Sequence, residues 1–179
     1  MRTMVISGTI LTVIGLVWIA NAQAPTTEVV GPARVIDGDT IEIKGQRIRL
    51  WGIDAPERSQ QCTDKMGYSY SCGRQATAVM QSLTKDHEVR CAVKDKDKYG
   101  RLVAMCEVDA VWDRTSMGIV ASSITMDLGD VMVLYGWAVD YTHYSKGYYA
   151  ADQASAIENR RGMHQGTFQQ PADYRHTGK

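Results

Sequence analysis

Hydrophobic and polar residues alternate with a period of two from about residue 28 onward, which is the pattern of strands with one buried face. Three such runs are rich in β-branched residues, and short polar turns that contain glycine separate them. In the third run Arg47, Arg49 and Trp51 fall on one face. Ile48 and Leu50 fall on the other face, which we expect to be buried. The pattern therefore predicts a meander of strands at residues 28–36, 40–43 and 47–53.

After residue 72 the spacing of apolar residues becomes helical. Apolar residues at i, i+3, i+4 and i+7 predict an amphipathic helix over residues 73–85. Two more strand patterns follow the helix, at residues 87–94 and 101–108, around a polar turn that ends in glycine. The inner face of the helix is expected to consist of Ala76, Val79, Met80 and Leu83.

The rest of the chain contains one ambiguous segment and two predicted helices. Residues 109–126 show no clean period, and we interpret them as an irregular insertion or an extra short hairpin. A helix is expected to begin at Asp127, a residue type that favours the N-cap, and to stop near Gly136. Another is expected over residues 148–161, with Gly162 as its C-cap. Its expected inward-facing residues are Ala150, Ala154 and Ile157.

An antiparallel meander with a helix inserted before its last hairpin is the element order of a small Greek-key barrel of the OB type. The two later helices would cap the open side of such a barrel. The predicted fold class is therefore α+β, a five-stranded antiparallel OB-fold (Greek-key) barrel with three helices. A chain of 179 residues can bury one good core, and nothing in its length demands a second domain.

The two ends of the chain differ in composition from the middle. Arg2 precedes an almost uncharged apolar run from Met4 to Ala20, and small residues at A-x-A spacing follow this run. This is the pattern of a signal peptide, although an uncleaved anchor competes with it because the run is nearly long enough to span a bilayer. We expect an exported protein, either periplasmic or secreted, or membrane-anchored if the segment is retained. The predicted parts are a signal peptide at residues 1–24, the domain at 25–168 and a loose polar tail at 169–179.

The charge balance excludes a generally basic protein that coats nucleic acid. The chain has 20 basic and 20 acidic residues, and Arg2 is the one charged residue that cleavage after residue 22 would remove. Any polyanion must therefore be held by a local cluster of cations, since the whole protein does not attract it.

Four cysteines after an export signal favour disulfides over a metal site. Three pairings are possible. We predict the two local ones, because Cys62 and Cys72 bracket a polar loop while Cys91 and Cys106 lie almost symmetrically about the turn at residues 98–100. A zinc site made of all four is the alternative, but the spacing lacks a close C-x-x-C pair.

Three carboxylates flank the first strands: Asp37, Asp39 and Asp54. Hairpin closure could bring them together at the edge of the barrel. Hard oxygen ligands in that number suit Ca²⁺ or Mg²⁺ better than zinc or copper. The competing interpretation is that residues 37–39 are only a turn, because Asp and Gly are common in turns.

Glu57 and two arginines complete the candidate chemistry. Glu57 follows Pro56 where the chain must leave the sheet, so its carboxylate could act as a general base on water beside the metal. Arg49 on the third strand and Arg101 at the mouth of the last hairpin could grip one phosphate from two sides. Each of the three could equally be an ordinary surface residue when considered alone.

Considered together, these residues resemble a known family. VIDGDT at 35–40, RIRLWGIDAPE at 47–57, DKYGR at 97–101 and GWAVDY to RRG between 136 and 162 closely resemble the thermonuclease family, of which staphylococcal nuclease is the namesake. The resemblance covers the chain from about Arg34 to Gly166. It implies an OB-fold barrel and calcium-dependent hydrolysis of phosphodiester bonds in DNA and RNA. It also implies that the P–O5′ bond breaks and leaves a 3′-phosphate.

The resemblance also implies a role for each matching residue. Asp39 and Asp54 would ligate Ca²⁺, helped by the backbone carbonyl of Ala55, with Asp37 as an outer-sphere partner. Glu57 would activate the attacking water. Arg49 and Arg101 would bind the phosphate and stabilise the transition state. The residues that could stack on or hydrogen-bond to a nucleotide are Tyr99, Tyr141 and Tyr144, for which a core or pocket role is an equal alternative.

The chain departs from the family at two positions. Ala55 replaces a threonine, which matters little if only its carbonyl binds metal, and His164 stands where the family usually has tryptophan. An exported calcium-dependent nuclease, expected to be a monomer without an obligate protein partner, is the preferred hypothesis. A non-catalytic nucleic-acid-binding module and a calcium-stabilised structural protein are the alternatives. A non-catalytic copy should have lost one of Asp39, Arg49, Asp54, Glu57 or Arg101, and all are present.

Overall fold

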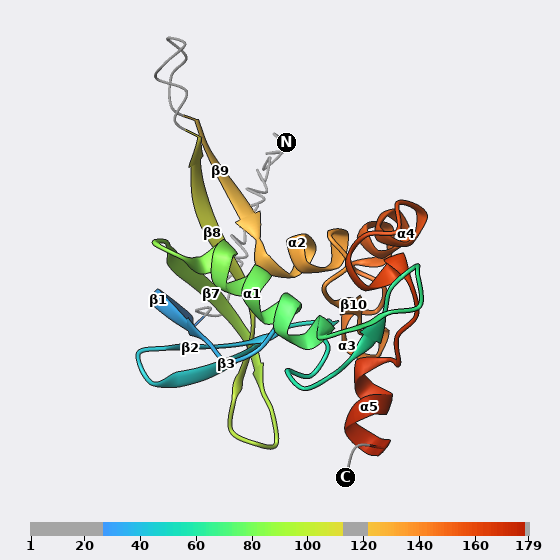
Figure 1. The fold of residues 1–179 in the computed structure, drawn as a ribbon. Coiled ribbons are helices and arrows are strands. Elements are labelled where there is room, and N and C mark those ends of the chain that lie inside the picture. Colours follow the sequence, from blue (N-terminus) through green and yellow to red (C-terminus); the bar gives the residue numbers. More distant parts are fainter. Residues whose placement is uncertain (1–26, 113–121, 178–179) are drawn as a thin grey trace, which may run out of the picture.

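The computed structural model describes residues 27–112 and 122–177. Its main feature is a sheet with the strand order β3-β2-β1-β7-β8-β9 that closes on itself because β3 also pairs with β8 (Figure 1). The closing pair is parallel, with Ile48 opposite Leu102, whereas the other pairs in this sheet are antiparallel. The predicted five-stranded barrel is thus confirmed. Its strands are β1 (Glu28–Val35), β2 (Thr40–Ile43), β3 (Gln46–Leu50), β7 (Glu88–Lys96) and β8 (Leu102–Trp112).

The ambiguous segment at residues 109–126 contains strand structure at both ends. β8 continues to Trp112, and β9 (Ser122–Asp127) pairs with it in antiparallel register, with Asp109 opposite Thr125. The two strands project from the barrel as a long hairpin in Figure 1. Of the two interpretations of this segment, the extra hairpin is therefore the right one for its described part, and residues 113–121 lie outside the described residues.

Short strands and helices make up the remainder of the described chain. Two pairs of short strands, β4 with β10 and β5 with β6, stand apart from the barrel sheet. The short strands are β4 (Ile53–Asp54), β5 (Cys62–Thr63), β6 (Ser69–Tyr70) and β10 (Val139–Asp140). The helices are α1 (Cys72–Thr84), α2 (Leu128–Leu134), α3 (Thr142–Ser145), α4 (Ala150–Glu158), the 3₁₀ helix η2 (Gly162–Gln165) and α5 (Pro171–Thr177).

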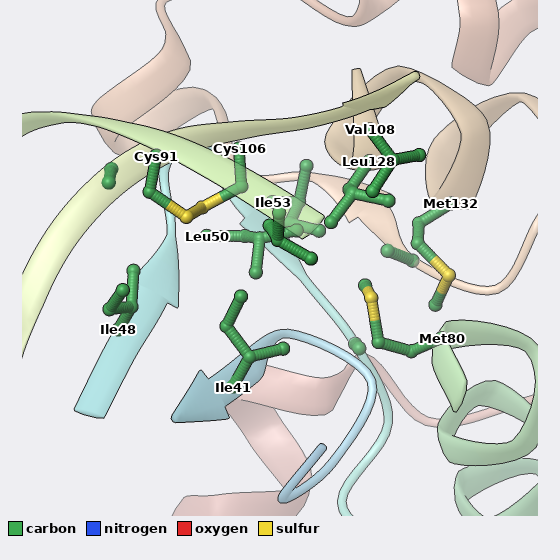
Figure 2. Packing of buried hydrophobic residues seen from close by; sticks show 14 of the residues in the cluster. Ile41, Ile48, Leu50, Ile53, Met80, Cys91, Cys106, Val108, Leu128 and Met132 are labelled. Carbon is green, nitrogen blue, oxygen red and sulfur yellow. A yellow bond between two sulfur atoms is a disulfide. The ribbon is translucent and has the colours of Figure 1, made fainter. Parts of the chain in front are cut away.

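The core lies between the barrel strands and the inner faces of α1 and α2 (Figure 2). Ile48 and Leu50 point inward from β3 and are almost fully buried, as the alternation in that strand predicts. Met80 from α1 and Met132 from α2 approach the same apolar interior from the other side in Figure 2. Flexible methionine side chains fill the irregular space between helix and sheet.

Two of the predicted helices form as expected. In α1 the residues Ala76 and Met80 are fully buried, while Val79 and Leu83 pack against the core from its margin. Asp127 caps α2 as predicted, because its side chain accepts hydrogen bonds from the amides of Gly129 and Asp130.

The predicted inner face of the third helix was wrong. Ala150, Ala154 and Ile157 are exposed, and the buried positions are Tyr149 and Ala156. The helix is turned about its axis because the Tyr149 ring is buried, where its hydroxyl donates to the carbonyl of Trp51. A large amphipathic ring has more apolar surface to bury than the alanines do.

The end of that helix also differs from the prediction. Gly162 is not its C-cap, since α4 ends at Glu158 with Asn159 as the capping residue. Gly162 has a φ of +52°, and a Cβ there would lie 2.3 Å from the carbonyl oxygen of Gly136. The glycine is therefore required by a close backbone contact with the end of α2 and not by the helix terminus. The tail was expected to be loose but instead forms α5.

Both predicted disulfides are present. Cys62 is bonded to Cys72 and Cys91 to Cys106, so no cysteine remains for zinc. Cys91 and Cys106 face each other across β7 and β8, and Figure 2 shows their bond inside the barrel beside Leu50.

Replacing Cys91 and Cys106 together by alanine should lower the free energy of unfolding by about 3 kcal/mol, since the bridge closes a loop of about 15 residues. Urea denaturation of the oxidised protein and the variant measures this difference. Wild-type protein unfolded under reducing conditions is the control, and it should lose stability by more because both bridges open. Equal stabilities for the double variant and the oxidised protein would contradict this role for the bridge.

Candidate active site

The turn between β1 and β2 fits tightly against the barrel mouth. The Asp37 carboxylate accepts a hydrogen bond from the Asp39 amide at 3.0 Å, which closes the turn on itself. A Cβ on Gly38 would lie 2.7 Å from the Cβ of Ala55, so only glycine allows this approach without a shift of the backbone. The amide of Leu50 donates to the Asp39 carbonyl at 2.8 Å. These contacts hold Asp39 beside β3.

Arg49 joins two buried carboxylates at this mouth. Its Nη1 lies 3.0 Å from Oδ1 of Asp39, and its Nη2 lies 2.7 Å from Oδ1 of Asp54. The two carboxylates are 5% and 1% exposed, so this ion pair is one that solvent screens little. The β2–β3 register explains half of the arrangement, because it sets Thr40, the residue after Asp39, opposite Arg49.

Asp54 is held in place by the pairing of two short strands. β4 and β10 form an antiparallel pair in which Asp54 lies opposite Val139. The next amide along the chain, that of Ala55, donates to Oδ2 of Asp39 at 3.1 Å. This hydrogen bond links the β1–β2 turn directly to the end of β4. The carboxylates of Asp39 and Asp54 both face Arg49.

Glu57 is placed by the loop that follows β4. A Cβ on Gly73 would lie 1.8 Å from the Glu57 carbonyl oxygen, so the first turn of α1 sits directly against this backbone. The Gln60 side chain is fully buried and accepts from the Glu57 amide at 3.2 Å, while the Gln60 amide donates back to the Glu57 carbonyl. The Glu57 side chain itself remains 37% exposed.

A third arginine, which the sequence analysis missed, reaches the same carboxylates from α5. Arg175 Nη1 lies 2.9 Å from Oδ1 of Asp54 and 3.2 Å from Oε1 of Glu57. Its Nη2 donates to Oδ2 of Asp54 at 3.0 Å. Nothing in the pattern of the polar tail distinguishes this arginine from a solvated one, so no sequence signal could have found it.

Within the described residues, Arg101 makes no ion pair with Asp39, Asp54 or Glu57. It follows the β7–β8 turn, where its Nε donates to Oδ2 of Asp97 at 2.7 Å. Asp97 also accepts from the amides of Tyr99 and Arg101. Burial alone would raise the pKa of Asp97, but these hydrogen bonds more than offset it and lower the pKa of this carboxyl overall.

One cleft of about 880 Å³ connects these parts. Tyr99 is 73% exposed at its rim, and its ring lies beside the Arg101 guanidinium. Tyr141 and Tyr144 also line the cleft and meet edge to face, with ring centroids 5.2 Å apart. The candidate residues that line the cleft are Asp37, Asp39, Arg49, Ala55, Glu57, Tyr99, Arg101, Tyr141 and Tyr144, with Arg175 in addition.

Comparison with known proteins bears on this arrangement. The family described as "Staphylococcal nuclease homologue" matches residues 47–165, which include Arg49, Asp54, Glu57 and Arg101. The chain belongs to the staphylococcal nuclease family. The resemblance noted in the sequence is thereby confirmed.

Curated relatives of this nuclease family carry three different names. The chain is 34% identical over 158 residues to the succinoglycan biosynthesis protein ExoI of Rhizobium meliloti, covering 87% of this chain and 73% of that protein. It is 34% identical over 116 residues to an uncharacterized endonuclease of Escherichia coli O157:H7, covering 63% and 60%. It is 28% identical over 117 residues to the micrococcal nuclease of Shigella flexneri, covering 63% and 58%. The chain thus spans about three-fifths of the two nucleases.

Two groups of this nuclease-family site, Asp37 and Arg49, have shifted pKa values. Burial raises the pKa of Asp37 to about 6, and repulsion by Asp39 adds to the shift. Burial lowers the pKa of Arg49, but the charges of Asp39 and Asp54 outweigh it and raise the pKa overall, so Arg49 stays charged. The carboxylates are therefore close enough to repel one another where a cation does not separate them.

The candidate metal ligands are oxygen atoms, which is the ligand type that calcium prefers. Asp39, Asp54 and the Ala55 carbonyl offer hard oxygen ligands, and calcium completes its coordination with water. Among the residues that the structure describes, no group of three or more acidic, histidine or cysteine side chains is close enough to hold a metal ion. The described arrangement is instead one in which guanidinium groups occupy the carboxylate oxygens.

His164, which stands where the family usually has tryptophan, packs edge to face against Phe168 with centroids 5.3 Å apart. Burial lowers the pKa of His164, and its Nε2 has no hydrogen-bond partner within the described part of the chain. The ring lines a separate hollow of about 490 Å³ and is not among the residues lining the cleft. We interpret it as a packing residue.

Two observations concern the location of the protein. Disulfides are typical of proteins that fold outside the cytoplasm, and this chain has two. None of the helices in residues 27–112 and 122–177 has the length and apolar character needed to cross a membrane. The predicted signal peptide lies outside the described residues.

Proposed function

We propose that this protein is an exported, calcium-dependent nuclease that hydrolyses phosphodiester bonds of DNA and RNA. The observation that carries the proposal is the bridge made by Arg49 between Asp39 and Asp54 at the wall of a cleft that also holds Glu57 and Arg101. The cleft combines hard oxygen ligands, a carboxylate that can accept a proton, and two guanidinium groups. A calcium-stabilised structural protein would need the first of these but not the others.

The metal would be held by Asp39, Asp54 and the Ala55 carbonyl, with Asp37 acting through a water molecule. Bound calcium would polarise a phosphate oxygen and so make the phosphorus more open to attack. Asp39 and Asp54 both pair with Arg49 at the wall of the cleft, so one side chain holds the two proposed ligands next to each other. Once a phosphodiester enters, Arg49 can turn from these carboxylates to the phosphate.

Glu57 would take a proton from the attacking water. A water molecule adds to the phosphorus, the P–O5′ bond breaks, and the proton lost by the water resides on the Glu57 carboxylate until the 5′-oxygen or solvent receives it. The product keeps a 3′-phosphate. The partial exposure of Glu57 supports this role, because the carboxylate lies within reach of water from the cleft.

Arg49 and Arg101 would stabilise the negative charge that develops on the phosphate oxygens. They reach the cleft from β3 and from the residue before β8, so they can approach one phosphate from different sides. The exposed rings of Tyr99 and Tyr144, together with Tyr141, line the same cleft and would stack on or hydrogen-bond to the bases. Stacking tolerates any base and either sugar, which agrees with a substrate range of both DNA and RNA.

The second candidate is a non-catalytic nucleic-acid-binding module of the same fold. The relative named for succinoglycan biosynthesis keeps this candidate open, because its name gives a biosynthetic context and no reaction. Against it, the five residues that catalysis would need are all retained here. A neutral chain with 20 basic and 20 acidic residues is also a poor passive binder of polyanions.

The proposal predicts that cleavage of DNA and RNA depends on calcium. Purified protein that begins near residue 25 should degrade both polymers with added Ca²⁺ and should stop when a chelator is in excess. Gel assays across Ca²⁺, Mg²⁺ and chelator, with end-group analysis of the products, measure this. Cleavage that continues undiminished in chelator would overturn the metal requirement, and binding without cleavage in Ca²⁺ would favour the second candidate.

A further inference from the structure

The C-terminal helix α5 brings a cation into the candidate active site from outside the segment matched to the family. The family match ends at residue 165, and α5 covers Pro171–Thr177. In Figure 1 the helix lies at the end of the chain, on the side of the barrel where α3 and the loop after β4 are found. Its Arg175 is the residue that contacts the candidate ligand Asp54 and the candidate base Glu57.

The contacts of Arg175 occupy both carboxylates at once. Three short distances, 2.9, 3.0 and 3.2 Å, join its two terminal nitrogens to oxygens of Asp54 and Glu57. Oδ2 of Asp54 accepts from Arg175 and from no other residue in the described part of the chain. Planar guanidinium groups match carboxylates in this two-pronged way, which makes the pairing stronger than that of a single charge.

The helix is seated by contacts that depend on the loop carrying Glu57. The buried Gln60 side chain donates to the carbonyl of Gln169 at 2.7 Å while its oxygen accepts from the Glu57 amide. Pro171 is buried, and the hydroxyls of Tyr174 and Ser59 lie 3.3 Å apart. One buried side chain thus connects the tail, the loop and the position of Glu57.

A guanidinium and a calcium ion cannot occupy the same oxygens of Asp54. Like charges at such short range repel, and the repulsion is large where the carboxylate is only 1% exposed. Arg49 can turn to an incoming phosphate from within the barrel, whereas Arg175 lies on α5, a helix of seven residues that contacts the loop after β4. The arginine that leaves on metal binding is therefore the one on α5.

We propose that Arg175 is a built-in counter-ion that holds the metal-free site closed, and that calcium binding displaces it together with α5. This inference rests on the proposed function, in which Asp39 and Asp54 are the calcium ligands. In the metal-free protein Arg175 offsets the charge of Asp54 and Glu57 and occupies Oε1 of the candidate base. Loss of that contact frees Oδ2 of Asp54 for the metal and releases Oε1 of Glu57 from its ion pair. Calcium binding then weakens the docking of α5, and the docking of α5 weakens calcium binding by the same factor.

The first test measures calcium affinity without nucleic acid. Titration calorimetry of Arg175→Ala should give a calcium dissociation constant about tenfold lower than that of the wild type, since metal binding no longer breaks charge-assisted hydrogen bonds. Arg58→Ala is the matched control, because Arg58 is exposed, follows Glu57 directly and makes no ion pair with a residue that the structure describes. It should change the constant less than twofold.

The outcomes of this titration are distinct. Equal affinities for wild type and Arg175→Ala, or equal gains in Arg175→Ala and Arg58→Ala, overturn the competition while leaving the proposed calcium site intact. Weaker calcium binding in Arg175→Ala also overturns it and makes Arg175 a supporting residue of the site. Failure of calcium to bind any of the three proteins overturns the proposed metal dependence and this inference with it.

The second test follows the tail itself. Amide hydrogen exchange of a peptide covering residues 169–177 should become faster when saturating calcium is added to the wild type, because undocked helices exchange readily. A peptide from α1 in the same digest is the internal control and should not become faster. An unchanged or slower rate in the tail would overturn the displacement of α5, whatever the affinities.

Discussion

Replacing Glu57 by glutamine is expected to lower the turnover number on DNA by about 10²–10⁴-fold, the usual contribution of a positioned general base. Glutamine keeps the size of the side chain and an oxygen that Arg175 can still contact at the Oε1 position. It cannot accept the proton of the attacking water. Binding of DNA should change little, because the phosphate would be held by arginines on other elements.

Glu42→Gln provides a matched control for this variant. Glu42 lies on β2 and pairs with Arg34 on the barrel surface, at 2.7 Å, and it is not among the residues lining the cleft. Steady-state rates in Ca²⁺ and fluorescence anisotropy with labelled DNA separate turnover from binding. Cleavage by Glu57→Gln at the rate of Glu42→Gln would remove Glu57 from the role of base.

The part of the site that lies close together in the sequence could be predicted from patterns. The turn at residues 37–39 and the strand that carries Arg49 belong to one hairpin meander, so their meeting follows from the alternation and from the turn residues. Asp54 comes at the end of the same run. The barrel itself was predictable for the same reason, because five strand patterns and an inserted helix admit few topologies.

The tail and the face of α4 could not be predicted in this way. α5 docks through Gln60 and Gln169, residues 109 positions apart in the chain, and both belong to polar stretches without period. In α4 the pattern of small apolar residues favoured the wrong face, because the burial of Tyr149 determines how the helix packs. Both errors arise from long-range packing of amphipathic or polar side chains, which hydrophobic periodicity cannot predict.

The arginines of the cleft differ in what holds them, and this difference bears on their expected roles. Arg49 and Arg175 are paired with candidate ligands and the candidate base, so calcium bound as proposed would change where they point. Arg101 is paired with Asp97 on its own turn and is independent of the metal. It is therefore the cation that is already oriented before calcium and substrate arrive.

Replacing Arg101 by lysine is accordingly expected to lower the turnover number by about 10²–10³-fold although the charge is retained, the range found when one transition-state hydrogen-bond donor is lost. Arg101 pairs with Asp97 through Nε, so the ion pair orients the guanidinium plane without using the terminal nitrogens. Lysine has one point charge and no planar fork. A single ammonium group therefore cannot pair with Asp97 and hold the phosphate in the geometry that the guanidinium allows.

Arg47→Lys is the matched control for Arg101→Lys, since Arg47 is exposed, lines the same cleft and has no role in the proposed chemistry. We expect its turnover to stay within about twofold of the wild type, because substitutions of exposed residues outside such a site have small effects. Single-turnover rates at saturating calcium measure both variants, and thermal melts test that both are folded. Equal rates for the two variants would show that a positive charge alone suffices at Arg101. That result would contradict a transition-state role for the planar guanidinium group.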